Sequence, residues 1–145
     1  MANKENIIIR KARDEDLIKV YKMGLARELS NPDGKPPRKW WIDGFLYEKQ
    51  FFYVVEKGKR IIGFALAERT TGNIMLIQEI FVKSEYRGGG IGDLLIKKLE
   101  ADAKKRKMRA ILLYAYAENR KTLHFYKKEK YGAGSFEEEF VKFLK

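Results

Sequence analysis

The sequence contains no cysteine and a single histidine among its 145 residues. Without cysteine there are no disulfide bonds, no thiolate nucleophile and no cysteine-ligated metal. The one histidine, His124, makes a histidine-rich metal site or a Ser-His-Asp triad an unattractive hypothesis. We therefore expect no bound metal.

Long apolar runs are missing as well. The first run, Ile7–Ile9, follows a polar start and is too short for the core of a signal peptide. No other run approaches the roughly 20 residues that a membrane-spanning helix needs. Because the length is close to the commonest domain size, residues 1–145 are expected to form one domain of a cytoplasmic protein that has no membrane partner.

Charge of one sign is in excess, with 31 lysines and arginines against 20 aspartates and glutamates and a net charge of +11. Such a field favours anionic partners, such as a phosphorylated cofactor, a nucleic acid or an acidic surface, without selecting one of them. Nucleic acid is the weaker hypothesis, because the sequence has no recognised base-reading or base-stacking motif. With 45% hydrophobic residues the chain is expected to fold around a core.

Hydrophobic periodicity predicts an alternation of strands and helices. Residues 51–56 and 61–68 are expected to form a hairpin, and the nearly continuous apolar run 74–82 a central strand. Further strands are predicted at 7–12, 110–117 and within 132–145, and helices at 14–30, capped by Asp14, and at 38–49, 91–107 and 119–128. Because segment 74–117 then forms a crossover between parallel strands, the predicted fold class is a mixed α/β sheet.

Between the central strand and the helix at 91–107 lies the run Arg87-Gly88-Gly89-Gly90-Ile91-Gly92. Glycines allow positive φ and a close approach of the backbone to a ligand. The following helix begins with unpaired N–H groups, so the loop and the helix start form a cradle for an anion such as a pyrophosphate, to which Arg87 adds a charge. A Rossmann fingerprint needs a third glycine and a Walker loop a Gly-Lys-Ser/Thr ending, and neither is present. The alternative is a flexible turn before an ordinary helix.

Two segments resemble the motifs of one family. The stretch Ile80–Gly92 is similar to the acetyl-CoA-binding segment of the GNAT acetyltransferase superfamily, whose signature is Arg/Gln-x-x-Gly-x-Gly/Ala after a strand. The stretch Asn119–Tyr126 resembles that family's Asn-x-x-Ala-x-x-Phe-Tyr pattern, with Thr122 in place of the alanine. The resemblance implies a GNAT-like, mostly antiparallel twisted sheet with a central parallel β-α-β crossover, helices on both faces, and acetyl-CoA as the acetyl donor.

The resemblance also implies roles for individual residues. Backbone groups of Ile80, Phe81 and Val82 would pair with the pantetheine arm like an added strand, in a gap between the strands at 74–82 and 111–117. Asn119 would contact the cofactor, and Tyr126 would lie near its sulfur. The pyrophosphate would be held by the amides of Arg87, Gly88, Gly89, Gly90, Ile91 and Gly92.

Acetyl transfer needs a neutral amine, and at pH 7 a lysine-like amine with a pKa of ~10.4 is protonated, a penalty of roughly 4–5 kcal/mol. Glu79 is the candidate general base, because burial in the apolar strand would raise the pKa of its carboxyl. If strand alternation holds, Glu79 shares a face with Ile77 and Phe81 and Gln78 points to the other face; a bulge would reverse this phase. With Gln78 toward the substrate, the proton would leave through ordered water instead. The alternative to a base role for Glu79 is a carboxylate paired with a lysine or arginine on a covering helix. Tyr126 is the candidate acid for the departing thiolate, its alternative being an aromatic packed in its helix.

The leading hypothesis is direct transfer of an acetyl group from acetyl-CoA to a primary amine in a ternary complex. A small-molecule acceptor, a polyamine or an amino-acid-like compound, is favoured because no recognition module is added and because Glu79–Gly92 also resembles the segment of diamine acetyltransferases. A protein N-terminal or lysine acceptor is the alternative, although some N-terminal acetyltransferases of the family carry a glutamate where this chain has Tyr114. A non-catalytic acyl-CoA-binding module and a basic nucleic-acid-binding module stay open. Because family members often pair through sheet edges, a homodimer is a further expectation.

Overall fold

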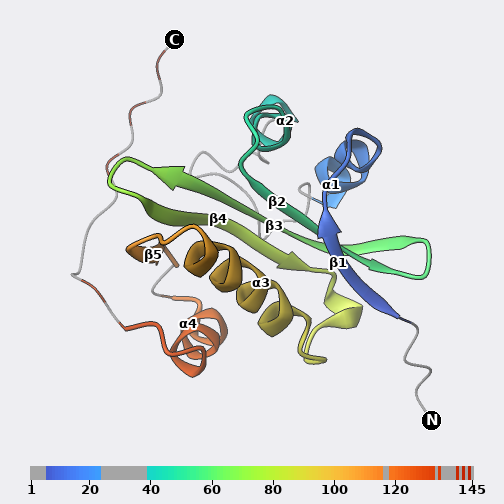
Figure 1. The fold of residues 1–145 in the computed structure, drawn as a ribbon. Coiled ribbons are helices and arrows are strands. Elements are labelled where there is room, and N and C mark those ends of the chain that lie inside the picture. Colours follow the sequence, from blue (N-terminus) through green and yellow to red (C-terminus); the bar gives the residue numbers. More distant parts are fainter. Residues whose placement is uncertain are drawn as a thin grey trace. The chain divides into compact units, whose positions relative to one another are not determined.

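The computed structural model describes residues 6–23, 39–115, 118–132, 134, 140, 142 and 144. Its contacts divide the chain into two compact units, Met1–Tyr114 and Ala115–Lys145 (Figure 1). The predictions of a helix at residues 24–30, of a strand at 116–117 and of most of the C-terminal strands fall outside the described residues. No helix in the described part of the chain is long and apolar enough to cross a membrane.

The first unit is built on one five-stranded sheet with the order β1-β2-β3-β4-β5. Its first four strands follow one another in antiparallel pairs, and β5 runs parallel to β4. This topology confirms the predicted hairpin, the parallel crossover and the mostly antiparallel mixed sheet. The strands are β1 (Ile7–Lys11), β2 (Phe51–Lys57), β3 (Arg60–Thr70), β4 (Ile74–Val82) and β5 (Ala110–Leu113).

Helices cover both faces of this sheet. The helices α1 (Leu17–Met23) and α2 (Lys39–Tyr47) pack on one face, and α3 (Ile91–Lys105) lies on the other (Figure 1). Because side chains alternate along a strand, β2 contributes to both layers. Phe52 and Val54 join the core under α1 and α2, whereas the hydroxyl of Tyr53 donates a hydrogen bond to Asp102 of α3.

The entry to α1 differs from the predicted cap. A short 3₁₀ turn, η1 (Asp14–Asp16), precedes the helix, and its capping carboxylate is Asp16 rather than Asp14. Asp16 Oδ2 accepts from the backbone N–H of Arg13 at 2.8 Å, and the guanidinium of Arg10 donates to both carboxylate oxygens at 2.7 and 3.0 Å. Asp16 is buried and the side chain of Asp14 instead accepts from the hydroxyl of Tyr47, so tertiary contacts decide which acid caps the turn.

The described part of the second unit contains α4 (Arg120–Lys128). Asn119 precedes the helix, and its side-chain oxygen accepts a hydrogen bond from the backbone N–H of Thr122 at 3.2 Å. Within this unit the ring of Tyr126 meets those of Phe125 and Tyr131 edge to face, with centroids 5.1 and 5.8 Å apart. The short helix predicted from the sequence is therefore confirmed.

Candidate active site

The strand β4 has a free edge over its second half. The parallel partner β5 pairs with Ile74–Ile77 and then ends, while β4 continues to Val82. From residue 78 to residue 82 the side of β4 that faces away from β3 has no strand partner among the described residues. Its backbone groups are therefore available to an extended ligand that adds to the sheet edge.

The register of β3 and β4 decides which backbone groups face this edge. The N–H of Lys83 donates to Ile62 of β3 at 2.8 Å. Because bonded and non-bonded pairs alternate in an antiparallel ladder, the groups of Phe81 are also directed to β3, and those of Ile80 and Val82 to the free edge. A Cβ at Gly63 would lie 2.6 Å from the carbonyl oxygen of Phe81, which fits this direction. Of Ile80, Phe81 and Val82, which were predicted to pair with the pantetheine arm, Ile80 and Val82 direct their backbone N–H and C=O groups to the free edge, and Phe81 does not.

The glycine loop follows directly on this edge. Gly88 and Gly90 have φ values of +82° and +84°, as expected for a conformation that favours glycine. Gly90 is the N-cap residue of α3, and its carbonyl oxygen accepts the first backbone hydrogen bond of the helix from the N–H of Leu94 at 3.1 Å. The backbone N–H groups of residues 88–93 find no acceptor in the described structure. These amides, with the positive end of the α3 dipole, can hold an anion such as a phosphate.

Arg87 lies between the loop and the free edge. Its Nε donates to the carbonyl oxygen of Val82 at 2.8 Å, and its guanidinium stands over the ring of Phe81 at 5.4 Å from the centroid. The side chain thus occupies an acceptor that an added strand would also use. The predicted contact between Arg87 and a pyrophosphate would require this guanidinium to share or leave Val82.

A β-bulge in β4 changes the faces of its polar residues. Leu66 of β3 pairs with Glu79 and Ala67 with Ile77, so Gln78 has no opposite residue. Leu66 belongs to the core under α1 and α2, as does Phe81, so Glu79 shares that face with Phe81 but not with Ile77. The prediction that Glu79 lies on the face of Ile77 is therefore wrong, and the bulge is the reason.

Gln78 points to the same face as Glu79. Its Nε2 donates to Oε1 of Glu68 at 3.0 Å, and Glu68 follows Leu66 by two residues along β3. The sequence placed Gln78 and Glu79 on opposite faces if alternation held, and the bulge overturns this arrangement too. Two carboxylates and an amide therefore occupy the α1/α2 face of the sheet at the bulge.

Glu79 is the titratable group that burial affects most clearly at this site. Desolvation raises the pKa of its carboxyl from 4.5 to about 7. No ion pair or hydrogen bond joins its carboxylate to another described residue. The alternative in which Glu79 pairs with a lysine or arginine therefore finds no support in the described part of the chain. A carboxyl that titrates near neutral pH suits a general base.

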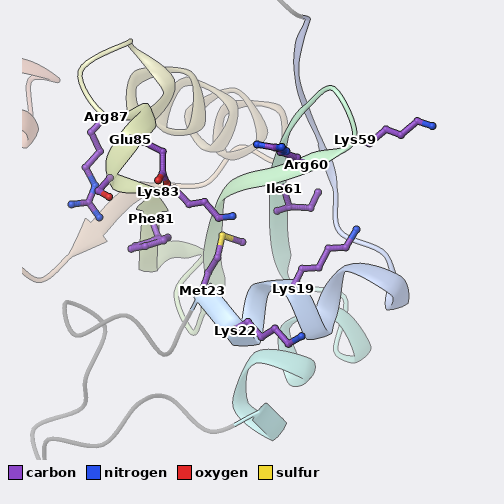
Figure 2. Close-up of a pocket in the computed structure, with 11 residues that line it drawn as sticks. Lys19, Lys22, Met23, Lys59, Arg60, Ile61, Phe81, Lys83, Glu85 and Arg87 are labelled. Carbon is purple, nitrogen blue, oxygen red and sulfur yellow. The ribbon is translucent and has the colours of Figure 1, made fainter.

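A cavity of about 800 Å³ lies on the α1/α2 face beyond Phe81 (Figure 2). Its lining comes from α1, from the turn between β2 and β3, and from the segment that joins β4 to α3. The buried side chains of Met23, Ile61 and Phe81 form its apolar part. Among the described residues its charged side chains are six basic ones and one acidic one, namely Lys19, Lys22, Lys59, Arg60, Lys83, Arg87 and Glu85. The sequence alone gives no sign of this cluster, because its members are scattered over segments that only the fold brings together.

Asn119 and Tyr126 belong to the second unit, where Asn119 caps α4 and Tyr126 packs among aromatic rings. Their contact with a cofactor at the glycine loop stays a prediction. His124, also on α4, is exposed. In the described residues no three His, Asp or Glu side chains are grouped in a way that could hold a metal ion.

Known proteins match this chain over most of its length. The family model described as "Acetyltransferase (GNAT) family" matches residues 16–132. An uncharacterized N-acetyltransferase of Methanocaldococcus jannaschii is 33% identical over 115 residues, which are 72% of this chain and 49% of that protein. The chain thus spans about half the length of this curated relative.

Solved structures share the fold. The ribosomal-protein-S18-alanine N-acetyltransferase from Escherichia coli is similar with a TM-score of 0.76 and 16% identity, over 90% of this chain and 80% of that one. AAC(6')-Iy in complex with the bisubstrate analogue CoA-S-monomethyl-acetylneamine has a TM-score of 0.74 and 19% identity, over 96% of this chain and 99% of that one. At such identities the likeness concerns the arrangement of helices and strands alone.

Proposed function

Because the chain belongs to the GNAT acetyltransferase family, we propose that it transfers an acetyl group from acetyl-CoA to a primary amine by direct transfer in a ternary complex. The acceptor is a small-molecule amine, either a polyamine or an amino-acid-like compound. In the reaction the amine nitrogen forms a bond to the thioester carbonyl carbon, the carbon–sulfur bond breaks, and the proton that the nitrogen loses balances the one that the departing thiolate gains.

The observation that carries this proposal is the joint geometry of the glycine loop and the free edge of β4. Unpartnered amides at residues 88–93 and the start of α3 suit a pyrophosphate, and an extended arm running from there reaches the backbone of Val82 and Ile80. That arm would lead toward the bulge at Gln78 and Glu79. A ligand with a pyrophosphate at one end and a peptide-like arm fits this order, and coenzyme A is such a ligand.

Glu79 is the proposed general base. An ammonium acceptor must lose a proton before it attacks, and a carboxylate with a pKa of about 7 accepts one at neutral pH better than an ordinary glutamate. Its side chain lies on the α1/α2 face beside the free edge of the strand. Gln78, held by its bond to Glu68, is no base and serves to position Glu68 on the same face.

Tyr126 is the proposed acid for the thiolate. A tyrosine hydroxyl is a hydrogen-bond donor, so it can give a proton to a leaving thiolate placed beside it. The support for this role is the resemblance of Asn119–Tyr126 to the second family motif. Substitution of Tyr126 by phenylalanine should lower kcat by roughly 10²-fold or more while the dissociation constant of acetyl-CoA stays within about twofold.

The decisive experiment is an acetyl-CoA turnover assay over a panel of primary amines, with thiol release as the readout. Wild type, Glu79→Gln and Tyr126→Phe are compared, and calorimetry with CoA checks that each variant still binds the donor. Turnover of at least one amine supports the enzyme. Tight CoA binding without turnover of any amine would show a non-catalytic acyl-CoA-binding module instead.

A protein acceptor is the second candidate, because one structural neighbour is named as an acetyltransferase of a ribosomal protein. Peptides with a free N-terminal amine, and matched peptides blocked at the N-terminus that carry a lysine, belong in the same panel. A kcat/KM for a peptide of eight or more residues that exceeds the value for every small amine by over tenfold would favour this candidate.

A further inference from the structure

We propose that the basic cavity beside Phe81 binds an anionic group of the acceptor, so that the acceptor is an amine that carries a negative charge some distance from its nitrogen. This inference rests on the proposed acetyl transfer and names the class of its acceptor. It selects anionic, amino-acid-like amines and excludes polyamines as good acceptors.

The first support is the excess of basic over acidic side chains among the described residues that line the cavity. The cavity is lined by Lys19 and Lys22 of α1, by Lys59 and Arg60 where β3 begins, and by Lys83 after β4. In Figure 2 the Lys59 side chain extends away from the other four. None of these five side chains forms an ion pair with a described residue. Glu85 is the one acid among the described residues of the lining. Like charges gathered without partners repel one another, and an anion placed between them removes that repulsion.

The second support is the apolar part of the cavity. Met23, Ile61 and Phe81 are all less than a tenth exposed and belong to the lining together with the cations. An apolar floor beneath a charged rim suits a ligand with a hydrocarbon or peptide body and a charged end. Inorganic anions alone would leave this floor uncovered.

The third support is the position of the cavity relative to the proposed base. Phe81 lines the cavity, and it shares its face of β4 with Glu79 two residues earlier. Two residues along a strand correspond to about 7 Å. On the α1/α2 face the carboxylates of Glu79 and Glu68 thus lie at one place and the cations of the cavity at another, and we call the stretch between them the track. An acceptor with its amine at the first end and an anion at the second complements both.

The length of this track constrains the acceptor. In an α-amino acid the nitrogen and the carboxyl carbon are separated by two bonds of about 1.5 Å each, which is too short to span the roughly 7 Å between Glu79 and Phe81. An ω-amino carboxylate gains about 1.3 Å for each methylene, so about five methylenes or more are needed to span the roughly 7 Å between Glu79 and Phe81. A dipeptide or tripeptide with a carboxylate at its far end reaches equally far.

A series of ω-amino carboxylates with one to seven methylenes, and the matched α,ω-diamines, provides the test. At saturating acetyl-CoA, kcat/KM should rise with chain length in the carboxylate series and exceed the value for the diamine of equal length by about tenfold or more. In the double variant Lys19→Gln/Lys22→Gln, the KM for the longer carboxylates should rise about tenfold while the values for diamines stay level or improve. Both lysines are exposed, so the substitutions leave the core intact.

The control is Lys104→Gln/Lys105→Gln, which removes the same charge from exposed positions on α3, on the other face of the sheet. It should change neither series by more than about twofold. Preference for diamines over carboxylates, or equal effects of the two double variants, would overturn the inference while leaving the acetyltransferase proposal intact. The same holds if the cavity variant weakens acetyl-CoA binding and spares the acceptor, since the cavity would then serve the donor. Acetyl-CoA binding without turnover of any amine would overturn both proposals.

Discussion

Glu79 is expected to destabilise the folded protein at neutral and alkaline pH, and its replacement by glutamine isolates that effect. Burial raises the pKa of the folded carboxyl from 4.5 to about 7, and no described cation offsets the burial. Each unit of pKa difference between the folded and unfolded states corresponds to about 1.4 kcal/mol. The folded state should therefore lose about 3 kcal/mol of stability relative to the unfolded state as Glu79 ionises.

The sign follows from the order of the two titrations. Below pH 4.5 the carboxyl of Glu79 is protonated in both states and does not lower the free energy of unfolding. Between pH 4.5 and about 7 the unfolded chain releases the proton while the folded chain retains it, so stability falls as pH rises. Above pH 7 both states are ionised and the loss is complete.

Urea denaturation of the wild type and of Glu79→Gln between pH 4 and pH 8 measures this directly. As pH rises from 4 to 8, the unfolding free energy of the glutamine variant should increase by about 3 kcal/mol relative to that of the wild type. Above pH 8 this difference should stay constant. Because other titrating groups are common to both proteins, their contributions cancel in the difference.

The Glu79→Gln substitution should lower the activity although it raises the stability. The variant should lose at least about 10²-fold in kcat, and the rise of the wild-type rate through pH 7 should disappear from its profile. An acceptor amine with a pKa below 6 removes the titration of the acceptor itself. A stability difference that is flat with pH would show that Glu79 is ionised normally in the folded state, and the argument for it as a tuned base would fail. Unchanged activity together with the expected stability gain would leave a buried glutamate without a catalytic role.

Other residues give equally direct tests. Gly90→Ala places a side chain at φ +84° and should cost about 1–2 kcal/mol of stability and weaken CoA binding, whereas Gly44→Ala, a helical position with open space around it, should do neither; equal effects would count against the loop geometry. Gly63→Ala drives a Cβ to within 2.6 Å of the Phe81 carbonyl oxygen and should lower the unfolding free energy by about 1–3 kcal/mol, and a melting temperature that does not fall would contradict the close packing of β3 on β4. Although burial opposes ionisation of Asp16, hydrogen bonds from Arg10 and Arg13 lower its pKa, so it stabilises the fold above its ordinary pKa of 3.8 and this contribution is lost as pH falls further. Asp16→Asn should cost about 2–3 kcal/mol at pH 7 in chemical denaturation, with the difference shrinking in acid, and a difference that grows in acid would refute the ion pair.

Local sequence patterns predicted much of the fold. The hairpin of β2 and β3, the strand β4 and the helix α3 follow from apolar periodicity and from turn residues, which act over a few neighbouring positions. The glycine run at residues 88–90 and its placement between a strand and a helix are likewise local. Positive φ at Gly88 and Gly90 follows from the residue type and the turn that it must form.

Features that depend on pairing between distant segments escaped these patterns. The choice of Asp16 over Asp14 as the capping acid depends on Arg10 of β1, and the faces of Gln78 and Glu79 depend on a bulge set by the register with β3. A single extra residue in a strand leaves no mark on composition, yet it reverses the phase of every side chain beyond it.

The amino-acid sequence by itself indicated the family and the glycine loop and predicted acetyl-CoA as the donor, because these inferences rest on short motifs of contiguous residues. Tertiary structure alone decided that Glu79 has no described partner, that Gln78 turns toward Glu68, and that lysines from α1, the β2–β3 turn and the end of β4 line one cavity. Burial and the clustering of charges are properties of segments folded against one another, and residues as far apart in sequence as Lys19 and Lys83 line the same cavity only when the sheet brings them together.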